Sequence, residues 1–216
     1  AVFATYLINY TIPRAGEVAR ASILTNYEDV PFEKAFGTIV AERIADLIVM
    51  LGIIGITLFL QFDFIYGFLI DKFDPIKIVI VLSAGVIMIL LFLRFIRKSK
   101  SKIALKIRTF VGGLIEGALS IFKMKKKWAY IVHTLFIWGM YVLMFYITSF
   151  SIVELNEISV GAILIGFISA SFSIAATNGG IGSYPLAIYA AFSIFGIPEE
   201  PSIAFGWIMW ASQTLM

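Results

Sequence analysis

The sequence contains no cysteine and only one histidine, His133. Without cysteine the chain can form no disulfide framework, no Cys-based zinc site and no thiol nucleophile, although this absence says little about its redox compartment. A single histidine makes most hydrolytic schemes improbable, and no Ser–His–Asp set, metal-ligand cluster or pair of acid/base carboxylates is visible. We therefore assign no catalytic residue, no metal and no cofactor, and the pattern favours a non-enzymatic role.

Charge is scarce as well. Only 14% of the 216 residues are charged and 60% are hydrophobic, whereas soluble globular chains have about 25% and 45–50%. This composition predicts one transmembrane domain over residues 1–216, with several crossings and no separate soluble domain. The first 12 residues resemble the end of a crossing, and the chain stops at Met216 within another apolar stretch. We expect a fragment, truncated at both ends.

The basic residues are concentrated in one segment. Between Arg94 and Lys127 lie 11 of the 17 lysines and arginines and a single acid, Glu116. A soluble nucleic-acid-binding protein can carry such a patch, but this one lies between two membrane segments, so we expect no nucleic-acid partner. The positive-inside rule predicts a multi-pass protein of the plasma (inner) membrane with residues 94–127 in the cytoplasm. Within residues 98–127, apolar residues at helical spacing predict a basic amphipathic helix at the interface.

An uncharged run of 41 residues extends from Ile158 to Pro198. It is too long for one crossing, which takes about 20 residues. A Gly-rich segment interrupts it, and non-helical backbone at membrane depth must be buried in protein or line a polar cavity. Its glycines either turn backbone N–H groups toward a bound anion or only permit a tight re-entrant turn and close helix packing. The residues concerned are Asn178, Gly179, Gly180, Gly182 and Ser183.

Two broken regions share one pattern, a short helix between a Pro- or Gly-containing break and a spanning helix. Matching them at an offset of about 166–170 residues places Arg43 near Gln213, and such repeats indicate transport sites. We predict an all-α, polytopic transmembrane helix bundle with two broken or re-entrant half-helix hairpins related as an internal repeat, parallel or inverted. The expected helices cover residues 14–27, 32–60, 76–95, 128–150, 158–176, 186–195 and 202 onward, with an acidic loop over 61–75.

Charged side chains cluster at the first broken region. Ionisable groups at membrane depth are costly unless paired or wetted, so they suggest function. The planar fork of arginine suits phosphate, and the arginines would bind a phosphate-bearing headgroup while the acids orient them. The alternative is that they form ion pairs that hold the hairpin together. The full candidate substrate-binding set is Arg14, Glu17, Arg20, Glu42, Arg43, Asp46, Asn178, Gly179, Gly180, Gly182, Ser183 and Gln213.

Three of these segments carry a family resemblance. Residues 13–20 (PRAGEVAR), 42–46 (ERIAD) and 179–182 (GGIG) resemble the motifs of the lysylphosphatidylglycerol synthase transmembrane, flippase-like family. The resemblance implies an inner-membrane protein related to the part of the multiple-peptide-resistance proteins that moves aminoacylated phosphatidylglycerol between leaflets. Two positions depart from the pattern, Asn178 where the family often has proline and Gln213 where it often has arginine, which puts that particular lipid in doubt. No aminoacyl-transferase domain lies within these residues.

Three functions remain open from the sequence. The first is a translocator (flippase) of a phosphate-bearing lipid or glycolipid headgroup, with an anionic phospholipid or a polyprenyl phosphate as its partner. The second is a membrane component of a lipid or polyprenyl-phosphate group-transfer pathway. The third is a scaffold for a lipid-modifying enzyme or glycosyltransferase. The cavity that the first two require predicts that Arg14, Arg43 and residues 178–182 converge in space.

Overall fold

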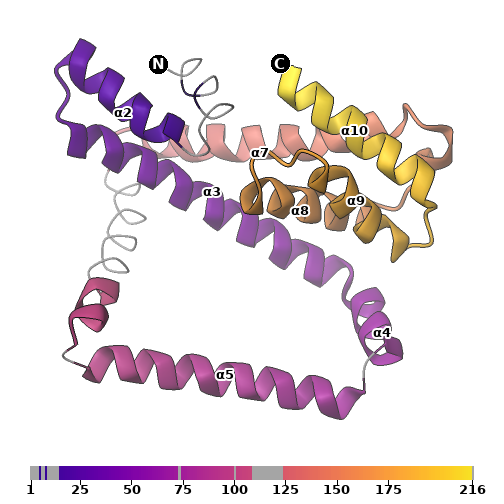
Figure 1. Cartoon of the computed structure of the whole chain (residues 1–216). Coiled ribbons are helices and arrows are strands. Elements are labelled where there is room, and N and C mark those ends of the chain that lie inside the picture. Colours follow the sequence, from indigo (N-terminus) through magenta and orange to yellow (C-terminus); the bar gives the residue numbers. More distant parts are fainter. Residues whose placement is uncertain are drawn as a thin grey trace.

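The computed structural model describes Thr5, Ile8 and residues 15–72, 74–99, 101–108 and 124–215. All regular secondary structure in these residues is helical, which confirms the predicted all-α fold (Figure 1). Residues 102–108 are also helical, and the rest of the expected amphipathic helix lies outside the described residues. The elements are α2 (Ala15–Glu28), α3 (Phe32–Leu60), α4 (Phe62–Lys72), α5 (Pro75–Lys98), α7 (Lys127–Ser149), the 3₁₀ turn η1 (Val153–Leu155), α8 (Val160–Ala176), α9 (Ser183–Ser193) and α10 (Glu199–Leu215).

Several of these helices are suited to a bilayer. Three segments of the described chain are long and apolar enough to cross a membrane, namely Ala35–Leu60, Val79–Ile96 and Lys127–Ser149. The 17 residues of α8 form a shorter apolar helix, which at 1.5 Å per residue is about 26 Å long, close to the roughly 30 Å of a hydrocarbon core. Large apolar side chains are exposed along these helices, as the lipid-facing surface of a membrane bundle requires.

The first broken region forms an antiparallel hairpin. Helix α2 precedes α3, and Pro31 and the left-handed Asp29 (φ 50°) lie in the turn between them. The small side chains of Ala21 and Ala35 are buried together with Ile39 between the two helices. Alanine at this contact lets the two backbones approach closely.

The main core lies among α7, α8, α9 and α10. Phe145 is fully buried and meets Phe205 edge-to-face, with ring centroids 4.8 Å apart, and Phe167 at 5.9 Å. Gly166 lies against Phe192, where an added Cβ would come within 2.6 Å of the ring. The second hairpin is therefore held by close packing of aromatic rings against small residues.

The secondary structure expected for one segment is wrong. The acidic segment 61–75 was expected to be a loop, but residues 62–72 form α4. Phe64 stacks on Phe195 of the segment after α9, with centroids 4.4 Å apart, and Asp63 and Asp71 are exposed. The apolar residues of the segment recur at helical spacing, and Ile65, Phe68 and Leu69 are half-buried on one face, which outweighs the loop signal of the three aspartates.

The starts of the last two helices also differ from expectation by three residues each. Helix α9 begins at Ser183, directly after Gly182, and Pro185 lies in its first turn. Helix α10 begins at Glu199 and has Pro201 in its first turn. Proline is tolerated there because the N–H groups of a first turn have no partner within the helix.

The two broken hairpins run in opposite senses. Figure 1 shows α2 antiparallel to α3 and α9 antiparallel to α10, with α3 and α10 running in opposite directions. An inverted repeat would require this arrangement, although the repeat itself stays a prediction. Helix α5 lies apart from the other helices in Figure 1, and most of its described side chains are exposed.

Candidate functional site

Five charged residues of α2 and α3 form the arginine–carboxylate cluster, defined as Glu17, Arg20, Glu42, Arg43 and Asp46. Its tightest pair joins the two helices of the first hairpin. The Arg20 guanidinium donates from Nη1 to Glu42 Oε2 at 2.9 Å and from Nη2 to Glu42 Oε1 at 3.1 Å. Both side chains are about one-third exposed. This bidentate geometry satisfies both groups and holds α2 against α3.

Arg43 is placed differently. Its Nε lies 3.5 Å from Glu17 Oε1 and its Nη1 lies 3.3 Å from Asp46 Oδ2. The side chain is 60% exposed, although Arg43 stands on the apolar segment Ala35–Leu60. The guanidinium is thus oriented by two carboxylates and still accessible. Arg14, predicted to belong here, lies outside the described residues.

A tryptophan connects the cluster to the main core. Trp138 on α7 donates from Nε1 to Asp46 Oδ1 at 3.2 Å, and its ring meets Phe167 of α8 edge-to-face with centroids 6.2 Å apart. Sequence reasoning missed Trp138, because it is 92 residues from Asp46 and an isolated tryptophan in a membrane helix has no signature of its own. Asp46 therefore orients Arg43 while being fixed by α7.

The Gly-rich break between α8 and α9 is closed by hydroxyl groups, and we call Ser173, Thr177 and Ser183 the hydroxyl turn. Ser173 Oγ donates to Ser183 Oγ at 2.8 Å, and Thr177 Oγ1 lies 3.0 Å from the same Ser183 oxygen. Thr177 Oγ1 also accepts the Gly180 N–H at 3.1 Å. The hydroxyls thus bond to one another and supply a partner for the buried Gly180 N–H.

Three glycines in this segment have positive φ. The values are 70° for Gly179, 75° for Gly180 and 72° for Gly182, a region that side chains with a Cβ rarely adopt. The N–H groups of Gly179 and Tyr184 are donated to the carbonyls of Thr177 and Gly180. A bound anion would need these two N–H groups and that of Gly180, but each of the three already has a partner within the turn. The bonds fit the re-entrant-turn interpretation, and the anion role stays a prediction.

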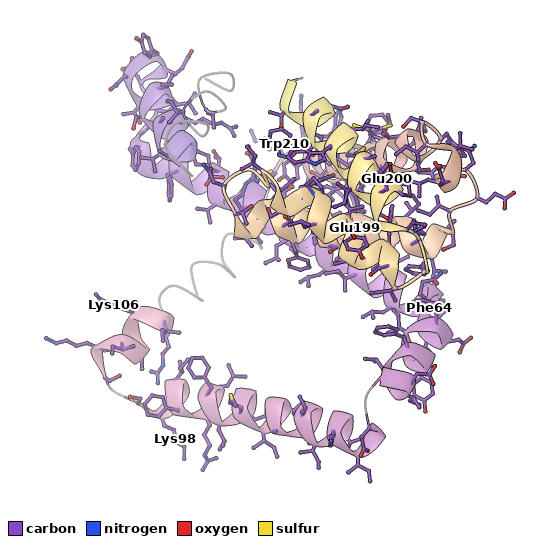
Figure 2. All side chains as sticks on the ribbon, turned by 45° about the vertical axis from the view of Figure 1, so that its right-hand side comes forward. Phe64, Lys98, Lys106, Glu199, Glu200 and Trp210 are labelled. Carbon is purple, nitrogen blue, oxygen red and sulfur yellow. The ribbon has the colours of Figure 1, made fainter. Side chains whose placement is uncertain are left out.

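Helix α10 contacts the same turn from the other side. Trp210 donates from Nε1 to the Gly179 carbonyl at 2.8 Å, and Gln213 donates from Nε2 to Tyr184 Oη at 3.0 Å. Figure 2 shows Trp210 on the side of α10 that approaches this turn. The predicted site residue Gln213 is thus placed where it fastens α10 to α9, and Asn178 is exposed.

The two groups remain distinct in the part of the chain that the structure describes. None of the hydrogen bonds and ion pairs among those residues joins the arginine–carboxylate cluster to the hydroxyl turn. The connection between them is indirect, through Trp138, Phe167 and α8. The predicted convergence of Arg14, Arg43 and residues 178–182 stays a prediction. No group of three or more described His, Asp or Glu side chains is arranged to hold a metal ion.

Comparison with known proteins gives one match. The family model described as "Lysylphosphatidylglycerol synthase TM region" matches residues 1–215. No curated protein and no solved structure matches the chain.

Proposed function

The chain belongs to the lysylphosphatidylglycerol synthase TM-region family of membrane proteins, and from this premise we propose that it moves a phosphate-bearing lipid headgroup between leaflets. The observation that carries the proposal is Arg43, an accessible guanidinium on a helix apolar enough to span the membrane. An ionisable side chain within a membrane helix is costly unless it is paired or reaches water, so such residues mark substrate paths.

The contacts of Arg43 support an exchangeable role. Its distances to Glu17 and Asp46 are 3.5 and 3.3 Å, whereas strong charge-assisted hydrogen bonds are about 2.7–2.9 Å long. A phosphate approaching the exposed side of the guanidinium can replace or join these carboxylates without leaving a buried charge unpaired. Arg20, by contrast, is held by both oxygens of Glu42, and we assign it to the stability of the hairpin.

Translocation of labelled phospholipids and polyprenyl phosphates in proteoliposomes of the full-length protein tests the proposal. Hydrogen bonds to charged groups contribute about 1.5–3 kcal/mol, so Arg43→Gln should slow protein-dependent movement about 10- to 100-fold. Arg43→Lys keeps the charge but loses the planar fork, so its rate of lipid movement should lie between the rates of wild type and Arg43→Gln. The matched control is Arg94→Gln on α5, an exposed arginine outside the cluster, which should move lipid at the wild-type rate.

Two outcomes contradict parts of the proposal. If folded Arg43→Gln moves lipid as fast as wild type, Arg43 is only a hairpin ion pair. If the folded wild-type protein moves none of the lipids, the translocator proposal is wrong, and group transfer or a scaffold role is favoured. We also propose that the protein is in the inner membrane with residues 94–127 in the cytoplasm, because the exposed Lys98, Lys102 and Lys106 gather at one end of α5, shown for Lys98 and Lys106 in Figure 2.

A further inference from the structure

A cavity of about 340 Å³ lies where α3, α4 and α8 meet Ile194, the residue that follows α9, and it is partly open to the surroundings. Side chains such as Ile54, Leu58, Phe68 and Ile165 line it. The only hydroxyl in the lining belongs to Thr57, and it is already donated to the Ile53 carbonyl at 2.8 Å. The cavity therefore offers contacts to hydrocarbon and no free polar side-chain group to a polar ligand.

The position of the cavity on α3 relates it to the arginine–carboxylate cluster. Ile54 follows Arg43 by 11 residues, which at 100° per residue returns to within about 20° of the same face. Along the axis, 11 residues correspond to about 16 Å. One leaflet accounts for half of the roughly 30 Å hydrocarbon core, about 15 Å. Arg43 and the cavity therefore share one face of α3 and are separated by about the depth of one leaflet.

We propose that this cavity holds the distal part of one acyl chain of the phospholipid whose phosphate contacts Arg43. The inference rests on the proposed function, and it adds a site for the lipid tail to the site for the headgroup. A helix of another protein is not the occupant, because a helix is about 10–12 Å across and a cavity of about 340 Å³ is too small to hold it. Non-helical backbone is unsuited because its N–H and C=O groups would meet no partners. Arg43 and the cavity are separated by about the depth of one leaflet, which is the reach of an acyl chain, so this spacing favours an acyl chain over a long polyprenyl chain.

Photo-crosslinking in proteoliposomes of the full-length protein tests the proposal. Two phosphatidylglycerol probes are used, with a diazirine near the methyl end or near the carbonyl of one acyl chain, and the labelled peptides are mapped by mass spectrometry. The methyl-end probe should label residues 54–69, and the carbonyl-end probe should label α3 closer to Arg43. Leu58→Trp fills the cavity and should lose most of the methyl-end labelling. The matched control is Leu60→Trp, because Leu60 is about as exposed as Leu58 on the same helix but does not line the cavity; this variant should keep the labelling.

Each contrary result overturns the proposal. Equal labelling of residues 54–69 by both probes, or equal labelling of Leu58→Trp and wild type, would mean that the probes report bulk lipid. Stronger competition by unlabelled polyprenyl phosphate than by phosphatidylglycerol would mean that the occupant is not an acyl chain. Translocation is measured in the same vesicles. Arg43-dependent movement without cavity labelling refutes this inference alone, and cavity labelling without movement refutes the proposed function alone.

Discussion

Replacing Gly206 by alanine adds one methyl group to α10 where it crosses α9. An ideal Cβ at this position would lie 2.4 Å from Pro185 Cα and 2.8 Å from Pro185 Cβ. Carbon atoms in favourable contact are about 3.5–4.0 Å apart, so α10 must move away from α9 by roughly 1 Å. The first obstacle is the backbone of α9, which cannot rotate aside as a side chain can.

The displacement would reach two hydrogen bonds on the same face of α10. Trp210 and Gln213 follow Gly206 by four and seven residues, so all three lie along one stripe of the helix. Their bonds to Gly179 and Tyr184 are 2.8 and 3.0 Å long, and a shift of roughly 1 Å takes both beyond hydrogen-bond distance. Overpacking costs about 1–3 kcal/mol and each lost bond about 0.5–1.5 kcal/mol, while the higher helix propensity of alanine offsets about 1 kcal/mol. Gly206→Ala should therefore destabilise the protein by about 1–5 kcal/mol.

Thermal unfolding of the purified protein in detergent measures this effect. Gly139 on α7 is the control, because an added Cβ there meets nothing within 4 Å. Alanine is the better helix former by about 0.8–1 kcal/mol, so Gly139→Ala should leave the melting temperature unchanged or raise it. The two variants carry the same substitution, but only Gly206→Ala should lower the melting temperature. If the melting temperature of Gly206→Ala equals or exceeds that of the wild type, the close packing of α9 against α10 is refuted.

Three further predictions test the site and its orientation. In a double-mutant cycle of Arg20→Ala and Glu42→Ala, the coupling energy should be about 1.5–3 kcal/mol, measured by unfolding; a coupling near zero would show that the bidentate pair does not hold the hairpin. Ser183→Ala removes two hydroxyl contacts of the hydroxyl turn and should cost about 1–3 kcal/mol, whereas an unchanged unfolding midpoint would mean that the turn is held by its glycines alone. Because the chain has no cysteine, an impermeant thiol reagent should label Glu154→Cys in intact cells and Lys106→Cys only after permeabilisation; the reverse pattern would invert the proposed orientation.

The helix boundaries show which local signals are reliable. The predicted helix 32–60 has the observed bounds of α3, Phe32–Leu60, because Pro31 and a long apolar run mark it. Helix α4 was missed because aspartates are common in loops. The helix is stabilised by contacts with residues distant in sequence, such as that of Phe64 with Phe195. Local composition cannot report a tertiary contact of this kind.

The candidate site shows the same difference between what local sequence predicts and what depends on tertiary contacts. The expected helices 14–27 and 32–60 placed Glu17 and Arg20 on one helix of the first broken region, and Arg43 and Asp46 on the next. Local sequence could not tell that Arg20 pairs with Glu42 while Arg43 lies between Glu17 and Asp46, because that choice depends on the rotation of α2 against α3.

The hydroxyl turn has a consequence for how α8 and α9 can move. Its side-chain bonds run between neutral hydroxyls and from a backbone N–H to a hydroxyl, all within eleven residues of the chain. Changing its depth in the bilayer would therefore uncover no ion and separate none of these partners. The first hairpin, by contrast, is held together by ion pairs between α2 and α3 and is bonded to α7 through Trp138. Helices α8 and α9 can shift together with their turn only by giving up the bonds from α10 and the ring contacts with α7 and α4, but this shift separates no ion pair.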